Sequence, residues 1–126
     1  MILKNNLYTI ASRSEGDATG ASFTLQLQPE CFIYAAHFPG EPITPGVCIV
    51  QMAKELLEEM LQCPLQIKMV KNVKFLSVLT PDETTEVTYD ISKVTHDVAT
   101  RQVKAQFAVT AAGETKAKVS LVCMPA

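Results

Sequence analysis

The sequence has few of the residues that hold metal ions. It contains only two histidines, and its four cysteines lie far apart with no Cys-x-x-Cys pair. A structural zinc site needs such ligands at short, regular spacings, so we expect no metal site. The cysteines are expected to be reduced, small and buried or half-buried, because a chain with a good apolar core does not need disulfides.

The chain also lacks an excess of positive charge. It carries 11 Lys and Arg against 13 Asp and Glu, a formal net charge of -2. Binding to phosphate groups requires a positive excess, so we expect no generic affinity for nucleic acid or for an anionic membrane. The opening MILKNNLYTI has three apolar residues that Lys4, Asn5 and Asn6 interrupt, so we expect no signal-peptide core there. No apolar stretch approaches the length of a membrane span. We therefore expect a cytoplasmic protein.

What the sequence does have is apolar residues in regular patterns. The chain is 126 residues long and 48% hydrophobic, enough for one ordinary core and too short for two. It shows no internal repeat, low-complexity tract or linker. We expect a single domain over residues 1–126.

Alternation of apolar and polar residues predicts several strands. They are expected at residues 7–11, 22–28, 86–94, 103–109 and 117–123, with a longer β-rich segment at 66–78. Residues 12–20 are rich in small and polar side chains and predict a surface turn. Residues 31–36 are expected to form a short extended piece.

A single long helix is predicted between these strands. From residue 46 to residue 61 or 62 the apolar residues recur at the spacing of one helical face. Thr44 is expected to cap the helix, with Pro45 in its first position, and Pro64 prevents continuation. Strands, one long helix and then more strands predict an α+β fold in which an antiparallel sheet covers the helix.

The segment before the helix carries a specific motif. It reads His37-Phe38-Pro39-Gly40-x-Pro42-x-x-Pro45-Gly46-Val47. This window resembles the signature of the β-hydroxyacyl-acyl-carrier-protein dehydratases, the FabZ/FabA group. Lys71-Asn72-Val73-Lys74-Phe75 and the later Pro81-Asp82-Glu83 resemble the strand and turn that follow in that group. The resemblance implies a hot-dog fold, in which a curved antiparallel sheet wraps one long central helix.

The resemblance also implies how a site would work. His37 would remove a proton next to an acyl thioester, since imidazole titrates near neutral pH. The N–H of Gly46, at the positive end of the helix dipole, would polarise the thioester carbonyl. The carbonyl of Ile43 would orient the His37 ring. The substrate-binding positions implied by the motif are Phe38, Pro45, Gly46 and Val47.

The sequence departs from the dehydratase pattern at the acid. Fourteen residues after His37, where the family has a carboxylic acid, stands Gln51, whose amide can form hydrogen bonds but cannot act as an acid. Glu55 follows one helical turn later, about 6 Å along the helix axis. We hypothesise that Glu55 replaces the acid, directly or through a water held by Gln51. The alternative is that Glu55 belongs to a solvated helix face.

Three functions therefore stay open. The resemblance favours a 3-hydroxyacyl-[acyl-carrier-protein] dehydratase, a hydro-lyase, of fatty-acid, polyketide or aryl-polyene biosynthesis. Its substrate would be bound covalently to the phosphopantetheine arm of acyl-carrier protein. The resemblance also implies a homodimer, which could assemble further into a trimer of dimers, and no separate cofactor. A hot-dog acyl-thioesterase would use Glu55 to activate water. A catalytically weak subunit that binds acyl carrier and pairs with an active paralogue would explain Gln51.

Overall fold

The structure is a computed structural model that describes residues 1–37 and 40–126, and only the backbone at Glu15. The elements in chain order are β1 (Tyr8–Asp17), β2 (Gly20–Leu27), α1 (Phe32–Ala36), α2 (Gly46–Leu61), β3 (Leu65–Phe75), β4 (Glu86–His96), β5 (Val103–Ala111) and β6 (Glu114–Pro125). The α+β class and the one long helix among antiparallel strands are as predicted from the sequence.

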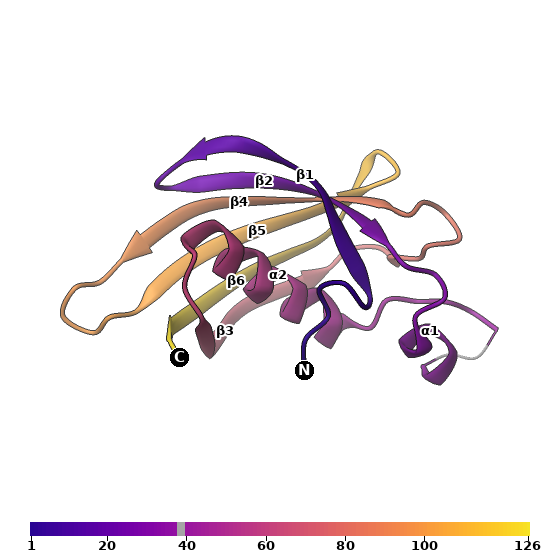
Figure 1. Ribbon diagram of the computed structural model, residues 1–126, viewed down its shortest axis with the longest axis horizontal. Helices are drawn as coiled ribbons and strands as arrows, with labels where there is room; N and C mark the ends of the chain where they lie inside the picture. Colours follow the sequence, from indigo (N-terminus) through magenta and orange to yellow (C-terminus); the bar gives the residue numbers. More distant parts are fainter. Residues whose placement is uncertain (38–39) are drawn as a thin grey trace.

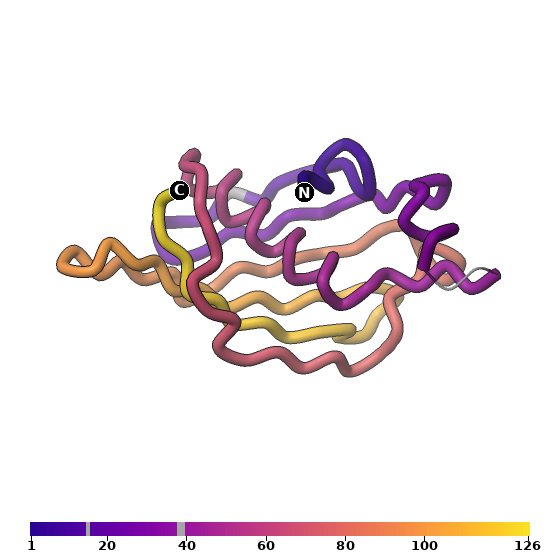
Figure 2. Tube along the Cα trace, turned by 90° about the horizontal axis from the view of Figure 1, so that it is seen from below, coloured from indigo at the N-terminus to yellow at the C-terminus, as the bar shows by residue number. Residues whose placement is uncertain are grey.

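The strands of the described residues form one antiparallel sheet that curves around α2. Its six strands lie in the order β1-β2-β4-β5-β6-β3, so β1 and β3 are the edges. The helix runs along the concave face of this sheet, which Figure 1 shows from the side and Figure 2 from below. The strand that follows α2 in the chain, β3, pairs with β6 from Leu65↔Pro125 to Phe75↔Ala117.

The core lies between the helix and the concave face. Met52, Leu56 and Leu57 on α2 have no exposed surface. Burying a side chain of this size contributes roughly 1.5–3 kcal/mol. The buried Tyr89 of β4 donates its hydroxyl to the Ile49 carbonyl at 2.9 Å, which fixes the helix against the sheet by a polar contact as well.

The helix ends where the sequence indicates. Gln62 takes a left-handed conformation (φ 54°, ψ 47°), and its N–H and that of Cys63 both bond to the Glu58 carbonyl. This geometry satisfies a terminal carbonyl and turns the chain before Pro64.

Two predictions about local structure are wrong. Residues 12–20 are not mainly a turn, because β1 continues to Asp17 and pairs with β2 through contacts such as Arg13↔Phe23. Residues of an edge strand can be polar because the strand faces solvent, so its sequence does not show the apolar and polar alternation that predicts a strand. Residues 31–36 are not extended: α1 covers Phe32–Ala36, because burial of Ile33 and Tyr34 outweighs their preference for strands.

The start of α2 also differs from expectation. Pro45 is the N-cap residue rather than the first helical residue, and no side chain caps the helix. The Thr44 hydroxyl instead pairs with the hydroxyl of Tyr34 at 2.9 Å, and both side chains are buried. Thr44 therefore ties α1 to the start of α2 instead of capping the helix.

The edge strand β3 carries exposed apolar side chains. Met69 is 57% exposed, Val70 47% and Phe75 54%, and the exposed Leu76 and Val78 follow directly. An open strand edge with such side chains is a surface that natural proteins usually cover. No helix in the described ranges is long and apolar enough to cross a bilayer.

Candidate active site at the start of the central helix

A cavity of about 450 Å³ opens at the first turn of α2. The helix contributes Gly46 and Ile49 to its wall, the preceding loop contributes Ile43 and Thr44, and the remaining wall is the segment from Phe75 to Leu79. The first N–H groups of an α-helix have no partner within the helix and carry the positive end of its dipole. The cavity thus combines an apolar lining with a place for a developing negative charge.

Phe75 forms the part of the wall that touches Gly46. A β-carbon added to Gly46 would lie 2.7 Å from Cζ and 2.9 Å from Cε2 of the Phe75 ring. Gly46 therefore has a packing reason to lack a side chain. The ring is the far end of a rotatable side chain, so it can move away, at the cost of its contact with the helix.

Backbone hydrogen bonds hold the cavity wall in place. The N–H of Thr44 bonds to the Leu79 carbonyl at 2.8 Å, which joins the helix start to the segment after β3. The N–H groups of Leu76 and Ser77 both bond to the Lys116 carbonyl, at 2.8 and 3.2 Å. The loop before α2 is thus tied to the segment after β3, and that segment is tied to β6.

His37 lies just after α1, with an exposed side chain. Its backbone N–H bonds to the Ile33 carbonyl at 2.9 Å and closes that short helix. In the described part of the chain no hydrogen bond joins the His37 ring to the Ile43 carbonyl, so the expected orienting contact stays a prediction. Phe38, a predicted substrate-binding residue, lies outside the described residues.

The other two predicted binding positions flank Gly46. Pro45 is half-buried at the helix cap, whereas Val47 is 67% exposed on the outer side of the first turn. Val47 does not line the cavity. An exposed valine here is available to a second chain.

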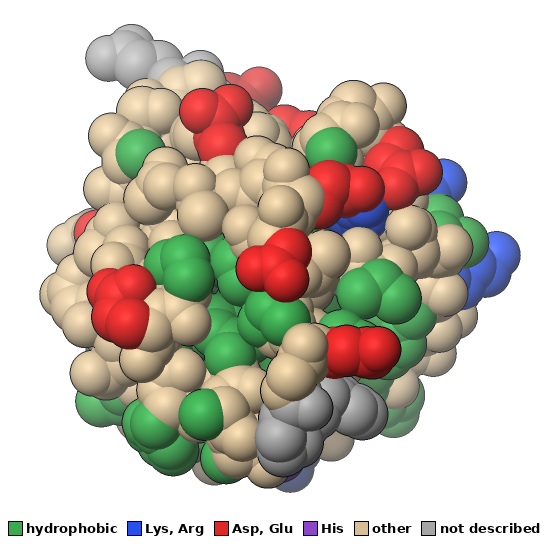
Figure 3. All heavy atoms as spheres, turned by 90° about the vertical axis from the view of Figure 1, so that its right-hand side faces the viewer, with side chains coloured by type: hydrophobic (Ala, Val, Ile, Leu, Met, Phe, Trp, Pro, Cys, Tyr) green, Lys and Arg blue, Asp and Glu red, His purple; other side chains and the backbone are tan. Residues whose placement is uncertain are grey.

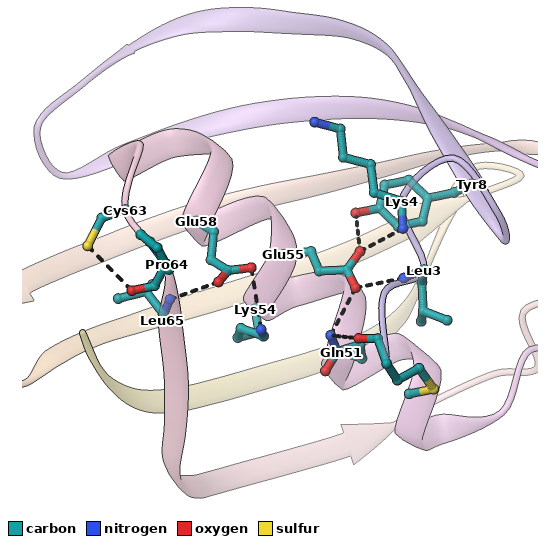
Figure 4. A network of polar contacts seen from close by, with 11 residues as sticks. Leu3, Lys4, Tyr8, Gln51, Lys54, Glu55, Glu58, Cys63, Pro64 and Leu65 are labelled. Atoms are coloured by element: carbon teal, nitrogen blue, oxygen red, sulfur yellow. Dashed lines mark hydrogen bonds and ion pairs between the residues drawn. The ribbon is translucent and has the colours of Figure 1, made fainter. Parts of the chain in front are cut away.

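Gln51 and Glu55 lie together on α2, facing the N-terminal residues rather than the cavity at Gly46. The amide nitrogen of Gln51 donates to Glu55 Oε2 at 2.9 Å and to the Met1 carbonyl at 2.8 Å. Glu55 also accepts the backbone N–H groups of Leu3 and Lys4, both at 2.8 Å. Figure 4 shows the bonds from Leu3, Lys4 and Gln51 converging on the Glu55 carboxylate.

Tyr8 completes this network. Its hydroxyl donates to Glu55 Oε1 at 2.9 Å. Burial, and then the nearby Glu55 charge, raise the pKa of Tyr8 well above its usual value, so the hydroxyl stays protonated and remains a donor. Glu55 is only 7% exposed and is not a solvated surface residue. Its two oxygens accept four hydrogen bonds, and the three from Leu3, Lys4 and Tyr8 attach the N-terminal part of the chain to α2.

Gln51 and Glu55 line a cavity of their own, of about 370 Å³, together with residues such as Ile2, Lys54 and Glu58. This cavity shares no lining residue with the one at Gly46. Within one chain, the structure brings Gln51 to Glu55 but brings neither into the cavity that contains Gly46. Sequence reasoning missed Leu3, Lys4 and Tyr8 as partners of Glu55, since they lie about fifty residues away in the chain.

Figure 3 views the end of the molecule that lies at the right of Figure 1. Hydrophobic side chains gather in the middle of this face, and acidic side chains surround them. The charged side chains near the middle of this face are mostly acidic, and Lys and Arg side chains lie toward its right edge.

Neither a metal nor an activated thiol is indicated at this site. Among residues 1–37 and 40–126 no group of three His, Cys, Asp or Glu side chains could hold a metal ion. Cys48 lies in the first turns of α2, and burial raises the pKa of its thiol. A thiol that resists ionisation is a poor nucleophile.

Comparison with known proteins agrees with the expected likeness to a dehydratase and with the fold. A family model of ApeI-like proteins, described as ApeI dehydratase, matches residues 12–119. The chain belongs to the ApeI-like dehydratase family. No curated protein matches the sequence.

Solved structures similar to this ApeI-like chain share its hot-dog fold, which confirms the predicted fold. The dehydratase heterocomplex ApeI:P from Xenorhabdus doucetiae matches with a TM-score of 0.66 at 17% identity, over 91% of this chain and 96% of that one. An uncharacterized protein from Erwinia carotovora subsp. atroseptica matches with a TM-score of 0.66 at 18% identity, over 94% and 97%. A mutant thioesterase, PA1618 from Pseudomonas aeruginosa, matches with a TM-score of 0.58 at 14% identity, over 90% and 81%.

Proposed function

We propose that this protein is a subunit of a 3-hydroxyacyl-[acyl-carrier-protein] dehydratase of the cytoplasm. His37 is the base that removes the proton next to the thioester carbonyl, and the N–H of Gly46 polarises that carbonyl. The substrate arrives on the phosphopantetheine arm of acyl-carrier protein. The observation that carries the proposal is the apolar cavity of about 450 Å³ at the first turn of α2, in a chain of the ApeI-like dehydratase family.

Each assigned role fits the chemistry of its residue. A neutral imidazole accepts a proton near pH 7, and general-base help of this kind typically contributes about 10²–10⁴ in rate. A helix N-terminus supplies preorganised N–H donors for a developing enolate oxygen. The apolar wall from Phe75 to Leu79 gives the acyl chain a dry environment.

The acid that protonates the departing hydroxyl is proposed to come from a partner chain. Gln51 cannot supply a proton as an acid, and its nitrogen is already bonded to Glu55 and to Met1. Glu55 accepts four hydrogen bonds, so a protonated Glu55 would have to break at least one of them. These contacts support a structural role for Glu55 more than the replacement of the acid.

A heteromeric assembly is consistent with this division of roles. The similar Xenorhabdus structure is a dehydratase heterocomplex. We propose that this protein pairs with a second hot-dog chain that carries a carboxylate at the position of Gln51. Pairing with a second copy of itself is the other possible assembly, and larger oligomers could follow from either.

The surface that supports pairing is the edge of β3. Met69 and Val70 on that strand and Val47 on α2 are all about half or more exposed. A second sheet joining at this edge would cover the open strand and the apolar side chains together.

An acyl-thioesterase is the second candidate function, because one similar structure is a thioesterase. It would require a carboxylate, such as Glu55, that activates water beside the thioester. The cavity of Gln51 and Glu55 shares no residue with the cavity at Gly46, which gives this function less support.

One assay separates the two functions. The purified protein, alone and with any hot-dog chain that co-purifies, is given 3-hydroxyoctanoyl acyl-carrier protein, and both the 2-enoyl product and free thiol are measured. A dehydratase forms the enoyl thioester without releasing thiol. Thiol release without enoyl product would overturn the proposal in favour of the thioesterase.

A further inference from the structure

We propose that Phe75 determines which acyl groups the site accepts. Linear chains bind, whereas chains with a branch at the carbon next to the thioester carbonyl are excluded. This inference rests on the proposed function, because it assumes that the thioester carbonyl binds at Gly46. It assigns to Phe75 a role in specificity rather than in the chemical step.

The position of the ring carries the inference. Three atoms of the Phe75 ring lie within 3.4 Å of the place that a β-carbon on Gly46 would occupy. The ring thus covers one side of the residue whose N–H would bind the carbonyl. Any group attached next to that carbonyl and directed to this side would meet the ring first.

The main chain of Phe75 is held by hydrogen bonds, so a shift of β3 cannot move the ring away from Gly46. Phe75 is the last residue of β3 and pairs with Ala117 of β6. The next two N–H groups are both bonded to the Lys116 carbonyl. Only rotation about the side-chain bonds remains, and Phe75 is 54% exposed in the single chain.

The composition of the cavity indicates what the ring discriminates. Except for Thr44 and Ser77 its lining side chains are apolar or absent, so selection there depends on volume rather than on hydrogen bonds. One methylene more or less in a hydrophobic pocket changes specificity by about 10–200-fold. A branch at the first carbon after the carbonyl adds at least that much volume close to Phe75.

Binding of pantetheine amides tests the inference without requiring turnover. The probes carry nitrogen in place of the thioester sulfur, one with a linear 3-hydroxyhexanoyl group and one with a 2-ethyl-3-hydroxyhexanoyl group. Calorimetry gives the ratio of their dissociation constants for wild type, Phe75→Ala and Val98→Ala. Val98 is the control, since it is also an exposed apolar residue but lies between β4 and β5, away from both the cavity and the β3 edge.

We expect wild type and Val98→Ala to prefer the linear probe by about 10-fold or more. Phe75→Ala is expected to lower this preference to about 3-fold or less by admitting the branched probe. If Phe75→Ala does not fold, Phe75→Leu should shift the ratio in the same direction by a smaller factor. An unchanged ratio in a folded Phe75 variant overturns the inference alone. Failure of both probes to bind the wild-type protein overturns the proposed function and the inference together.

Discussion

The side-chain amide of Gln51 donates a hydrogen bond of 2.9 Å to the carboxylate of Glu55, one turn further along α2. Gln51, which the resemblance to the dehydratases puts at the position of the acid, is thus bonded to the nearest carboxylate in the sequence. Both are bonded to the N-terminal residues, Gln51 to the Met1 carbonyl and Glu55 to the N–H groups of Leu3 and Lys4. This relationship indicates that the pair stabilises the fold.

Replacing Glu55 by Gln should destabilise the protein. The amide has one acceptor oxygen instead of two, and its NH₂ group would face backbone N–H donors, so buried donors lose their partner. Leaving such a group unsatisfied costs about 1–3 kcal/mol. Urea denaturation measures this loss in the free energy of unfolding.

Glu59→Gln is the matched control for Glu55→Gln. Glu59 pairs with Lys4 at 2.9 Å, but both side chains are about one-third exposed. Pairs of this kind are worth about 0–1 kcal/mol. Equal losses in the two variants would show that Glu55 is not the anchor of the N-terminus.

Gly46→Ala should have opposite effects in two backgrounds. In the wild type the new methyl group would displace the Phe75 ring from a contact of 2.7 Å, so the variant should lose stability. In a Phe75→Ala background the space is free, and replacing glycine by alanine in a helix should gain about 0.5–1 kcal/mol. Thermal unfolding of the four proteins measures the coupling. Additive effects would mean that the ring does not rest on Gly46 in solution.

The ion pairs of Lys116 should make stability depend on pH. Its ammonium group, 1% exposed, lies 2.5 Å from Glu114 and 2.6 Å from Glu83. Hydrogen bonds to Glu114 and then to Glu83 raise the pKa of Lys116, and hydrogen bonds from Lys116 and then from Ser77 lower the pKa of Glu114. The lysine's contribution is present below its ordinary pKa and lost as the pH rises through the raised value. The carboxylate's contribution is present above its ordinary pKa and lost as the pH falls through the lowered value.

Lys116→Met removes both contributions. The difference in melting temperature between wild type and this variant should therefore be greatest between about pH 5 and pH 9 and should shrink on both sides. Lys118→Met, which alters an exposed lysine of the same strand, should show a difference that hardly changes with pH. A flat profile for Lys116→Met would contradict the ion pairs.

Substitution at the β3 edge should weaken association with a second hot-dog chain. Val70→Asp puts a charge on the open strand that we propose to be covered, and burying an unpaired charge is costly. Sedimentation velocity should show a shift toward the monomer. Val98→Asp changes a valine that is 93% exposed, between β4 and β5, and should leave the oligomer intact. Equal behaviour of the two variants would place the interface elsewhere.

The fold could be predicted because its patterns are local. Buried residues recur at every second position over most of β4 and β5, and the helix has an apolar stripe between a proline at its start and one after its end. The short α1 was missed, since five residues give too few turns for a helical period to be visible and Phe32, Ile33 and Tyr34 favour strands. The extension of β1 was missed because polar residues of an edge strand look like a turn.

The candidate site could be predicted only in part. The motif from His37 to Val47 predicted the start of the helix, where the cavity opens. The environment of Glu55 depends on Leu3, Lys4 and Tyr8, which are distant in sequence and are brought to α2 by the fold. The contact of Phe75 with Gly46 likewise arises from the pairing of β3 with β6, and no local pattern indicates it.

The most direct test of this account is the rate at which 3-hydroxyoctanoyl acyl-carrier protein is converted to the 2-enoyl product. The assay compares wild type, His37→Ala and Glu55→Gln, each in the assembly in which the protein purifies, with rates normalised to folded protein. We predict that His37→Ala lowers kcat by about 10²-fold or more, whereas Glu55→Gln stays within about 3-fold of wild type. A rate that is insensitive to His37→Ala, or a Glu55→Gln protein that is folded and as inactive as His37→Ala, would contradict it.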